Sequence, residues 1–95
     1  PTMYAAQGYD TARAIAAALK QTGGSVDDTE AFRTAMLKAD FESVRGYFAF
    51  GKNQHPIQDW YAMTVAPGDD GAMTLKTRAK ILEHHGDPFA AECGL

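Results

Sequence analysis

Four residues near the end of the chain have side chains that could do chemistry. His84, His85, Asp87 and Cys93 lie within ten residues of one another, and such residues bind zinc or serve as nucleophile and base. Adjacent histidines point in different directions, and the sequence has no H-x-x-x-H or C-x-x-C pair to complete a tetrahedral metal site. We therefore expect two solvent-facing histidines before a turn, and neither a metal nor a cofactor.

The remaining reactive side chains give catalysis no better support. A nucleophilic Cys93 would need an oxyanion hole and an orienting carboxylate held in a pocket, and a thiol so close to the last residue is poorly placed for one. Asp69 and Asp70 lie in a Pro-Gly turn segment, where aspartate is favoured for its local hydrogen bonds. Gly68 and Gly71 are not followed by Lys and Ser or Thr, so a phosphate-binding loop is not indicated. The sequence predicts no enzyme.

Tyr4, Gln7 and Tyr9 form a better candidate site, for binding a ligand. They lie just ahead of, or at the start of, the first expected helix, in a segment too short and polar to form a core by itself. Where an extended segment enters a helix, backbone N–H groups and aromatic faces are both available to a ligand. The alternative is that both tyrosines pack in the interior.

The composition is that of one ordinary soluble globular domain. The chain has 95 residues, of which 45% are hydrophobic and 22% are charged, and this is not typical of disorder. The formal net charge is −3 and the Lys and Arg residues are scattered, so neither a nucleic acid nor an anionic membrane surface is indicated as a partner. The lone Cys93 fits either a reduced cytosolic protein or one half of a disulfide whose partner is missing.

Two amphipathic helices are expected in the first half of the chain. The first covers residues 9–20 and ends at a glycine pair. The second covers residues 28–39, with Asp27 as its N-cap and Glu30 three residues later in an approximate capping box. The apolar stripes that define them are Ala12, Ile15, Ala16 and Leu19 in the first helix, and Phe32, Ala35, Met36 and Ala39 in the second.

From residue 46 onward the pattern is that of extended chain. The glycine-bounded aromatic run 46–51 and the β-leaning run 57–66 flank the polar residues 52–56, which predicts a β-hairpin. A second turn is expected at 67–71 because of its Pro-Gly and Asp residues.

The last part of the chain is less determined by its pattern. Periodicity fits either a strand or a helix for residues 73–82, with strand favoured at the start, and leaves 76–85 open between the two. A short terminal helix is expected from Asp87 as cap, with Pro88 at its first position.

Four blocks of sequence together resemble the C-terminal part of the Leu/Ile/Val-binding protein family, especially the branch that binds aromatic acids. In chain order the blocks are YAAQGYDTAR (4–13), FESVRG with FAFG (41–51), NQHPIQDWY (53–61) and DPFAAEC (87–93). The resemblance spans essentially all 95 residues. It would cover roughly a quarter of a full receptor, which is a chain of two α/β lobes.

This resemblance implies the C-terminal portion of a type I periplasmic-binding fold, of the α/β class. Residues 1–60 would give the C-terminal part of lobe one, with two helices and a hairpin near the hinge. Residues 61–95 would cross into lobe two and form its tail. Trp60 and Tyr61 would mark the hinge crossing, and solute would bind in the interlobe cleft, outside the carboxyl ends of the strands.

The resemblance also implies roles for single residues. The family's aromatic contact to the solute matches Tyr4, at the end of a lobe-one strand, and Gln7 and Tyr9 are weaker correspondences. Relatives with this ending can tie the last cysteine to one upstream, so Cys93 is a disulfide candidate in an oxidising periplasm.

The implied function is that of a non-catalytic receptor in the periplasm, with a signal peptide expected upstream. It would close on an amino acid or aromatic acid and dock on the membrane permease of an ABC importer. Taken alone, the chain would self-associate or pair with the missing N-terminal part. The alternative is a cytosolic ligand-sensing or regulatory domain built on the same receptor fold, with Cys93 reduced.

Overall fold

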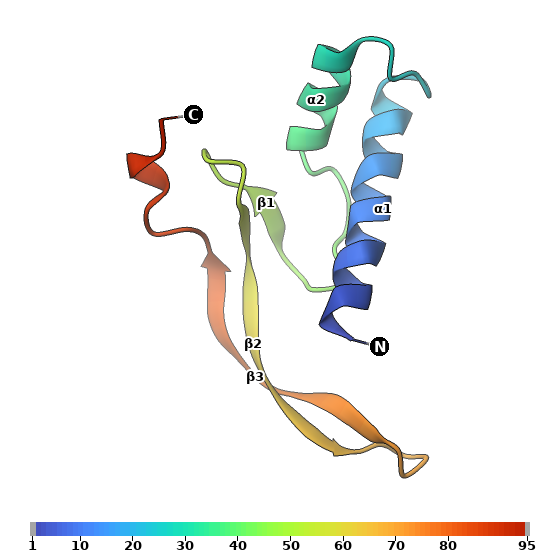
Figure 1. Ribbon diagram of the computed structural model, residues 1–95, viewed down its shortest axis with the longest axis vertical. Helices are drawn as coiled ribbons and strands as arrows, with labels where there is room; N and C mark the ends of the chain where they lie inside the picture. Colours follow the sequence, from blue (N-terminus) through green and yellow to red (C-terminus); the bar gives the residue numbers. More distant parts are fainter. Residues whose placement is uncertain (1, 95) are drawn as a thin grey trace.

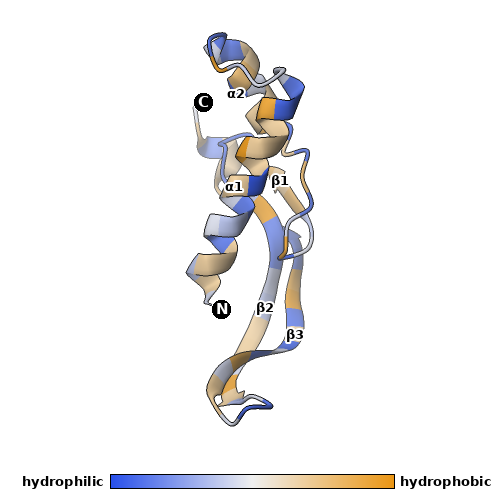
Figure 2. Cartoon of the chain, turned by 90° about the vertical axis from the view of Figure 1, so that its right-hand side faces the viewer, coloured by the Kyte–Doolittle hydropathy of each residue, from blue (hydrophilic) through white to orange (hydrophobic). Residues whose placement is uncertain are grey.

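The computed structural model describes residues 2–94, which form two helices, three strands and one short 3-10 helix. In chain order these are α1 (Met3–Gln21), α2 (Thr29–Leu37), β1 (Phe48–Phe50), β2 (Pro56–Pro67), β3 (Met73–His85) and η1 (Ala90–Glu92). Figure 1 shows the two helices side by side, next to the upper part of an antiparallel sheet of order β1-β2-β3. The β2–β3 ribbon continues past the N-terminal end of α1 in the views of both Figure 1 and Figure 2.

Helix α1 begins earlier than its periodicity predicts, at Met3 and not at residue 9. Thr2 is the N-cap, and its Oγ1 accepts a hydrogen bond from the Ala5 N–H at 3.2 Å, as N-cap threonines do. The predicted end is confirmed, because α1 stops at Gln21 and the two glycines that follow have φ angles of 64° and 87°.

The face of α1 that packs is not the predicted one. Asp10, Ala14 and Ala18 are buried, whereas Ile15 is 40% exposed. Alanines occur on every side of this helix, so hydrophobicity hardly distinguishes its faces, and small side chains let a neighbouring element approach closely on any of them. The stripe predicted through Ala12, Ile15, Ala16 and Leu19 was therefore wrong.

Helix α2 is shorter than predicted at both ends. Its N-cap is Asp28, whose Oδ1 accepts a hydrogen bond from the Ala31 N–H at 2.9 Å. Asp27, the predicted cap, instead accepts a hydrogen bond from the Ser25 hydroxyl at 3.1 Å. The predicted apolar face is confirmed, with Ala35 buried.

The predicted hairpin is confirmed as the pair of β1 and β2. Phe48 lies opposite Gln58 and Phe50 lies opposite Pro56 in antiparallel register. The Phe48 ring lies 5.2 Å, centroid to centroid, from the rings of both Phe41 and Phe50. This small aromatic cluster holds the loop after α2 against the start of the sheet.

Residues 73–85, which fit either strand or helix by periodicity, form a strand throughout. β3 pairs with β2 from Met73 opposite Pro67 to His85 opposite Gln58. After β3, Asp87 accepts a hydrogen bond from the Phe89 N–H at 2.8 Å. The expected terminal helix is only a 3-10 turn, η1.

Among the apolar side chains of the described part of the chain, only small ones are buried. They are Ala14, Ala18 and Ala35. Within the described residues, no large side chain is less than 2% exposed. Figure 2 shows apolar residues along the lower half of the ribbon, where no other element covers it. The large exposed side chains of the ribbon include Met63, Val65, Met73, Leu75 and Ile81. Residues 2–94 therefore present apolar faces that they do not themselves cover.

Candidate functional site

The first turns of α1 carry the three residues predicted to bind a ligand. Tyr4 and Tyr9 are 76% and 56% exposed, and Gln7 is exposed as well. All three lie on the helix itself, because Thr2 already caps it, and not at a strand end ahead of it as the resemblance implied for Tyr4. Both rings are exposed, so neither packs in an interior formed by residues 2–94.

Helix geometry divides these three residues between two sides of α1. Each residue advances by about 100° around the axis, which places Gln7 roughly 60° from Tyr4 and Tyr9 roughly 140° from it in the opposite sense. The Arg13 guanidinium lies over the Tyr9 ring, at 5.9 Å from its centroid. The structure thus brings Tyr4 and Gln7 to a common side and leaves Tyr9 apart.

An open groove lies between the start of α1 and the far end of the ribbon. It has a volume of about 290 Å³ and is lined by Thr2, Val65, Met73, Thr74 and Leu75. Val65 lies opposite Leu75 in the ladder, and side chains of directly paired residues share a face of the sheet. The groove therefore has an apolar floor beside the helix turn that carries Tyr4.

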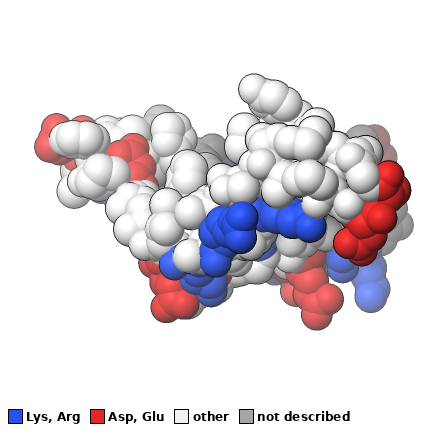
Figure 3. Space-filling model, turned by 90° about the horizontal axis from the view of Figure 1, so that it is seen from below, with Lys and Arg blue, Asp and Glu red and all other residues white. Residues whose placement is uncertain are grey.

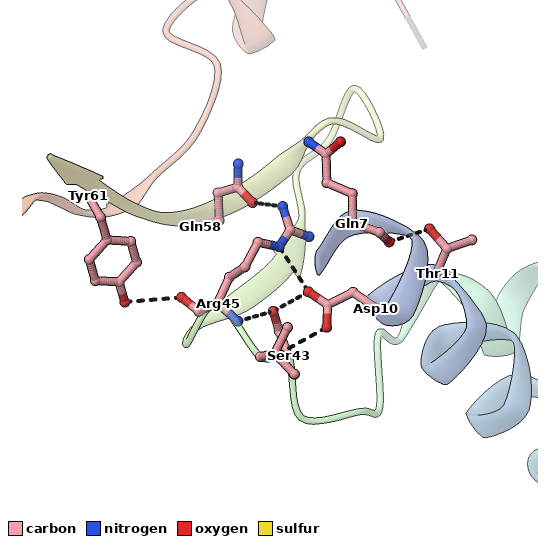
Figure 4. A network of polar contacts seen from close by, with 8 residues as sticks. Gln7, Asp10, Thr11, Ser43, Arg45, Gln58 and Tyr61 are labelled. Atoms are coloured by element: carbon pink, nitrogen blue, oxygen red, sulfur yellow. Dashed lines mark hydrogen bonds and ion pairs between the residues drawn. The ribbon is translucent and has the colours of Figure 1, made fainter. Parts of the chain in front are cut away.

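A buried carboxylate fastens α1 to the sheet, as Figure 4 shows. Asp10 is 2% exposed. Its Oδ2 accepts hydrogen bonds from Ser43 Oγ at 2.6 Å and Arg45 Nε at 2.9 Å, and its Oδ1 accepts one from the Val44 N–H at 3.0 Å. Arg45 Nη1 donates in turn to Gln58 Oε1 at 2.7 Å. One arginine therefore connects the helix that carries Tyr4 and Gln7 to the start of β2.

The electrostatics of Asp10 suit an anchor. Burial raises the pKa of the Asp10 carboxyl, but the hydrogen bonds from Ser43, Arg45 and the Val44 N–H, with the Arg45 charge, outweigh burial and hold the pKa below its ordinary value. A general base at neutral pH needs a raised pKa and an accessible oxygen. Asp10 has neither, so its role is to position the segments around it.

Both residues predicted at the hinge lie in β2, close to this network. The Tyr61 hydroxyl donates a hydrogen bond to the Arg45 carbonyl oxygen at 3.0 Å. Gly46 has a φ of 96° and lies so close to Tyr61 that a Cβ at this position would be 3.0 Å from the Tyr61 hydroxyl oxygen. Trp60 is 47% exposed and lies on the opposite face of the strand, because successive side chains alternate. Tyr61 is thus fastened to the loop that holds Asp10.

A second buried carboxylate connects β2 to β3. Asp59 is 7% exposed, and it accepts hydrogen bonds from Lys80 Nζ at 2.7 Å and from the His84 N–H at 3.0 Å. Lys80 lies 3.3 Å from Glu83 Oε1 as well. The Lys80 hydrogen bond, followed by that of the His84 N–H, lowers the pKa of Asp59, and the same contact raises the pKa of Lys80.

The possible metal cluster near the end of the chain is dispersed. The His84 ring stacks on Tyr47 with centroids 3.8 Å apart, and Asp87 accepts a hydrogen bond from Asn53 Nδ2 at 2.7 Å. Cys93 is a free, half-buried thiol. Within residues 2–94, no three His, Cys, Asp or Glu side chains are grouped so that they could hold a metal ion.

Charges of both signs are interleaved on the underside of the molecule. Figure 3 shows Lys and Arg side chains gathered near the middle of this face, with Asp and Glu side chains around them. A long stripe of one sign, as nucleic-acid binding would require, does not form on this face. Of the helices in residues 2–94, none has the length and apolar character needed to span a bilayer.

The residues that organise this region were not identified from the sequence. They are Asp10, Arg45, Asp59 and Lys80. No local signal marked Asp10, because alanines occur on every side of α1 and its partners lie 33 to 35 residues later in the chain. No spacing rule could indicate Asp59, because its partners lie 21 and 25 residues later on an irregularly paired strand.

Comparison with known proteins identifies the family. A family model described as a periplasmic binding protein matches residues 1–72, which include α1, α2, β1, β2 and the turn after β2. Searches of curated proteins and of solved structures found no match. The matched residues contain the exposed Tyr4 and Gln7, the Asp10 network and the strand with Trp60 and Tyr61. The chain belongs to the periplasmic binding protein family.

Proposed function

We propose that the chain is the C-terminal part of a solute receptor of the Leu/Ile/Val-binding type. The receptor captures an amino acid or an aromatic carboxylic acid between two lobes and delivers it to the membrane permease of an ABC importer. The family match over residues 1–72 carries this proposal, because membership supports solute binding in general. Two satisfied buried carboxylates, Asp10 and Asp59, are consistent with a binding protein that performs no catalysis.

The proposed lobe boundary follows the contacts of β2. Residues 1–60 belong to lobe one, and the Asp10 network supports this because it fastens α1 to β2 as far as Gln58. Residues 61–95 cross into lobe two, and the ribbon beyond this point runs past the end of α1 (Figure 1). Trp60 and Tyr61 lie at the crossing.

We assign the solute-facing surface to the side of α1 with Tyr4 and Gln7. Tyr4 offers an exposed ring and Gln7 an exposed amide, a combination that suits an aromatic or aliphatic side chain beside a polar group. The apolar groove beside Thr2 lies at the same end of α1, although Tyr4 and Gln7 do not line it. Tyr9 belongs to the other side of the helix and is not expected to touch the same solute.

A thermal-shift screen of the whole receptor tests the proposed function. Amino acids and aromatic carboxylic acids are the compounds to add, each at concentrations up to the millimolar range. A ligand present at 100 times its dissociation constant adds about 2.7 kcal/mol to the free energy of unfolding, which is a clear rise in melting temperature. If no compound of either class raises it, the proposed solute class is wrong.

The Tyr4→Ala variant tests the proposed contact surface. Loss of the ring is expected to weaken solute binding by roughly 1–3 kcal/mol, while the melting temperature of the unliganded receptor stays nearly constant because the side chain is exposed. Tyr9→Ala is the matched comparison, and we expect it to leave affinity unchanged. Isothermal calorimetry and thermal unfolding measure both quantities. Unchanged affinity in Tyr4→Ala would remove Tyr4 from the binding surface.

The proposed location is the periplasm, with a signal peptide upstream of this chain and the permease as protein partner. Osmotic-shock release of the receptor from intact cells, together with a cytosolic marker enzyme that stays behind, tests the location. Retention with the marker would favour the cytosolic alternative.

A further inference from the structure

Strand β3 is longer than the part of β2 that it faces. Between Met63 opposite Thr77 and Gln58 opposite His85, the six residues 58–63 of β2 face the nine residues 77–85 of β3, so β3 carries three extra residues. The register shifts occur at three separate steps within this short stretch, whereas the pairing from Met63 to Pro67 is regular. Extra residues of this kind are β-bulges, which bend a strand and increase its twist.

Asp59 lies opposite the first of these bulges and accepts hydrogen bonds from two residues of β3. His84, within the bulged part of β3, has a φ of 45°, a conformation that is uncommon for a residue other than glycine. Its N–H is directed at Asp59 Oδ1, at 3.0 Å. The other oxygen, Oδ2, receives Lys80 Nζ at 2.7 Å. One buried carboxylate thus binds both Lys80 and the His84 N–H of the bulged segment.

The surroundings of Asp59 keep it charged and fixed. The hydrogen bond from Lys80, followed by that from the His84 N–H, holds the pKa of Asp59 below its ordinary value. The Tyr61 hydroxyl lies 3.5 Å from Asp59 Oδ2 and donates to the Arg45 carbonyl oxygen. Asp59 is therefore in contact with the network that fastens α1 to the sheet.

From these contacts we infer that Asp59 is a positioning residue that fixes the bend of the β2–β3 ribbon relative to α1. The bulges supply the bend, and the carboxylate selects one arrangement of them by holding Lys80 and the His84 N–H together. On the proposed function, on which this last step rests, the bend sets the orientation of one lobe relative to the surface with Tyr4 and Gln7.

Hydrogen exchange in the whole, unliganded receptor tests the local part of this inference. In Asp59→Ala, the amides of residues 77–85 are expected to exchange at least about tenfold faster, because the bulged segment opens locally more often. Asp59→Asn keeps an oxygen for the His84 N–H but loses the ion pair, so a smaller increase is expected. Glu83→Gln removes only the exposed partner of Lys80, a kind of pair that contributes little, so it is the comparison variant, with less than about a twofold change expected. Equal exchange in Asp59→Ala and the unmodified receptor would overturn the inference.

The bend itself is measured by the distance between spin labels placed at Ala16 on α1 and Asp69 at the tip of the ribbon. We expect the distance distribution in Asp59→Ala to be at least about twice as wide as in Glu83→Gln, because several bulge arrangements become populated. A distribution of unchanged width and mean, even with faster exchange, would overturn the positioning role. Asp59→Asn is expected to fall between the two.

A separate measurement connects the bend to binding. With a solute found in the screen, Asp59→Ala is expected to weaken binding by about tenfold, since the two lobes are no longer pre-oriented. Unchanged affinity in a variant with a widened distribution would overturn the last step alone. If no solute binds, the proposed function fails, while the exchange and distance measurements still decide the role of Asp59.

Discussion

At the scale of single residues, Asp10 joins α1 to three consecutive residues of one loop. It holds a serine, an arginine and a backbone N–H that lie 33 to 35 residues later in the chain. Removing one member of such a buried, charged network leaves the others without partners, which costs more than the contact itself is worth.

The Asp10→Asn variant is expected to lower the free energy of unfolding of the receptor by about 2 kcal/mol at neutral pH. The pKa of Asp10 is lowered in the folded state from an ordinary value of 3.8. A lowered pKa contributes stability that is present above the ordinary value and is lost as the pH falls through the folded-state value. The difference in free energy of unfolding between the variant and the unmodified receptor should therefore become smaller below about pH 4.

Chemical denaturation at several pH values measures this difference. Asp69→Asn in the exposed turn is the control and should stay within about 0.5 kcal/mol of the unmodified receptor at every pH. A stability difference for Asp10→Asn that persists unchanged at pH 3 would contradict the assigned role of its charge.

A second single-residue prediction concerns the oxidation state of the Cys93 thiol. The thiol is half-buried and unpaired within the described residues. From the resemblance of the ending DPFAAEC to the Leu/Ile/Val-binding family, we expect it to form a disulfide with an upstream cysteine in the whole receptor. Under non-reducing conditions the intact mass should then be lower by two hydrogen atoms, and Cys93 should resist alkylation. Full alkylation of the folded receptor without reductant would show a free thiol.

At the scale of elements, the loop before β1 is shaped by a glycine that no other residue can replace without strain. Gly46 has a φ of 96°, and a Cβ there would meet the Tyr61 hydroxyl and the Asp59 carboxylate at 3.0 and 3.2 Å. Gly71, in the turn between β2 and β3, has a similar φ of 80° but open space around it. The two positions thus differ in crowding and share the unfavourable backbone conformation.

Gly71→Ala is expected to lower the free energy of unfolding by about 1 kcal/mol, because the only unfavourable change is an alanine in the left-handed conformation. Gly46→Ala adds a clash with Tyr61 and Asp59, so we expect its cost to exceed that of Gly71→Ala by at least about 1 kcal/mol. Denaturant midpoints of the two variants in the same receptor give the comparison. Equal costs would mean that the loop relaxes around the added methyl group.

At the scale of the whole molecule, residues 2–94 are extended and expose a large surface. The radius of gyration is 16.3 Å, against roughly 12 Å for a compact domain of this length. The accessible surface is 6827 Å², which is about 1,500 Å² more than a compact monomer of the same mass would have. A stable interface buries roughly 800 Å² on each partner, so the excess is large enough for other protein segments to cover.

We therefore expect the isolated chain to self-associate and the co-expressed N-terminal part to suppress this. Open strand edges along the ribbon and exposed apolar side chains both favour pairing. Sedimentation velocity of residues 1–95, alone and with the N-terminal part, distinguishes the two states. A compact, stable monomer of the isolated chain at high concentration would contradict the prediction.

What the sequence determined by itself was local. The glycine pair that ends α1, the polar turn between β1 and β2 and the apolar face of α2 all follow from conformational preferences or periodicity over a few residues. The blocks of residues that resemble the Leu/Ile/Val-binding proteins indicated the broader periplasmic binding protein family, because a family pattern is read along the chain. None of these inferences needed to know which distant segments meet.

The features that only the tertiary structure decided depend on contacts between segments that are distant in the sequence. The packed side of α1 contains Asp10 because the loop at Ser43 to Arg45 lies against it, and α2 packs on the same helix. An alanine-rich helix offers no stronger face of its own. β3 has three more residues than the part of β2 that it faces. Asp59 of β2 binds both Lys80 and the His84 N–H in this part of β3. In both cases a buried charge and its partners, 21 to 35 residues apart, fix the geometry, and no local preference encodes a contact over that distance.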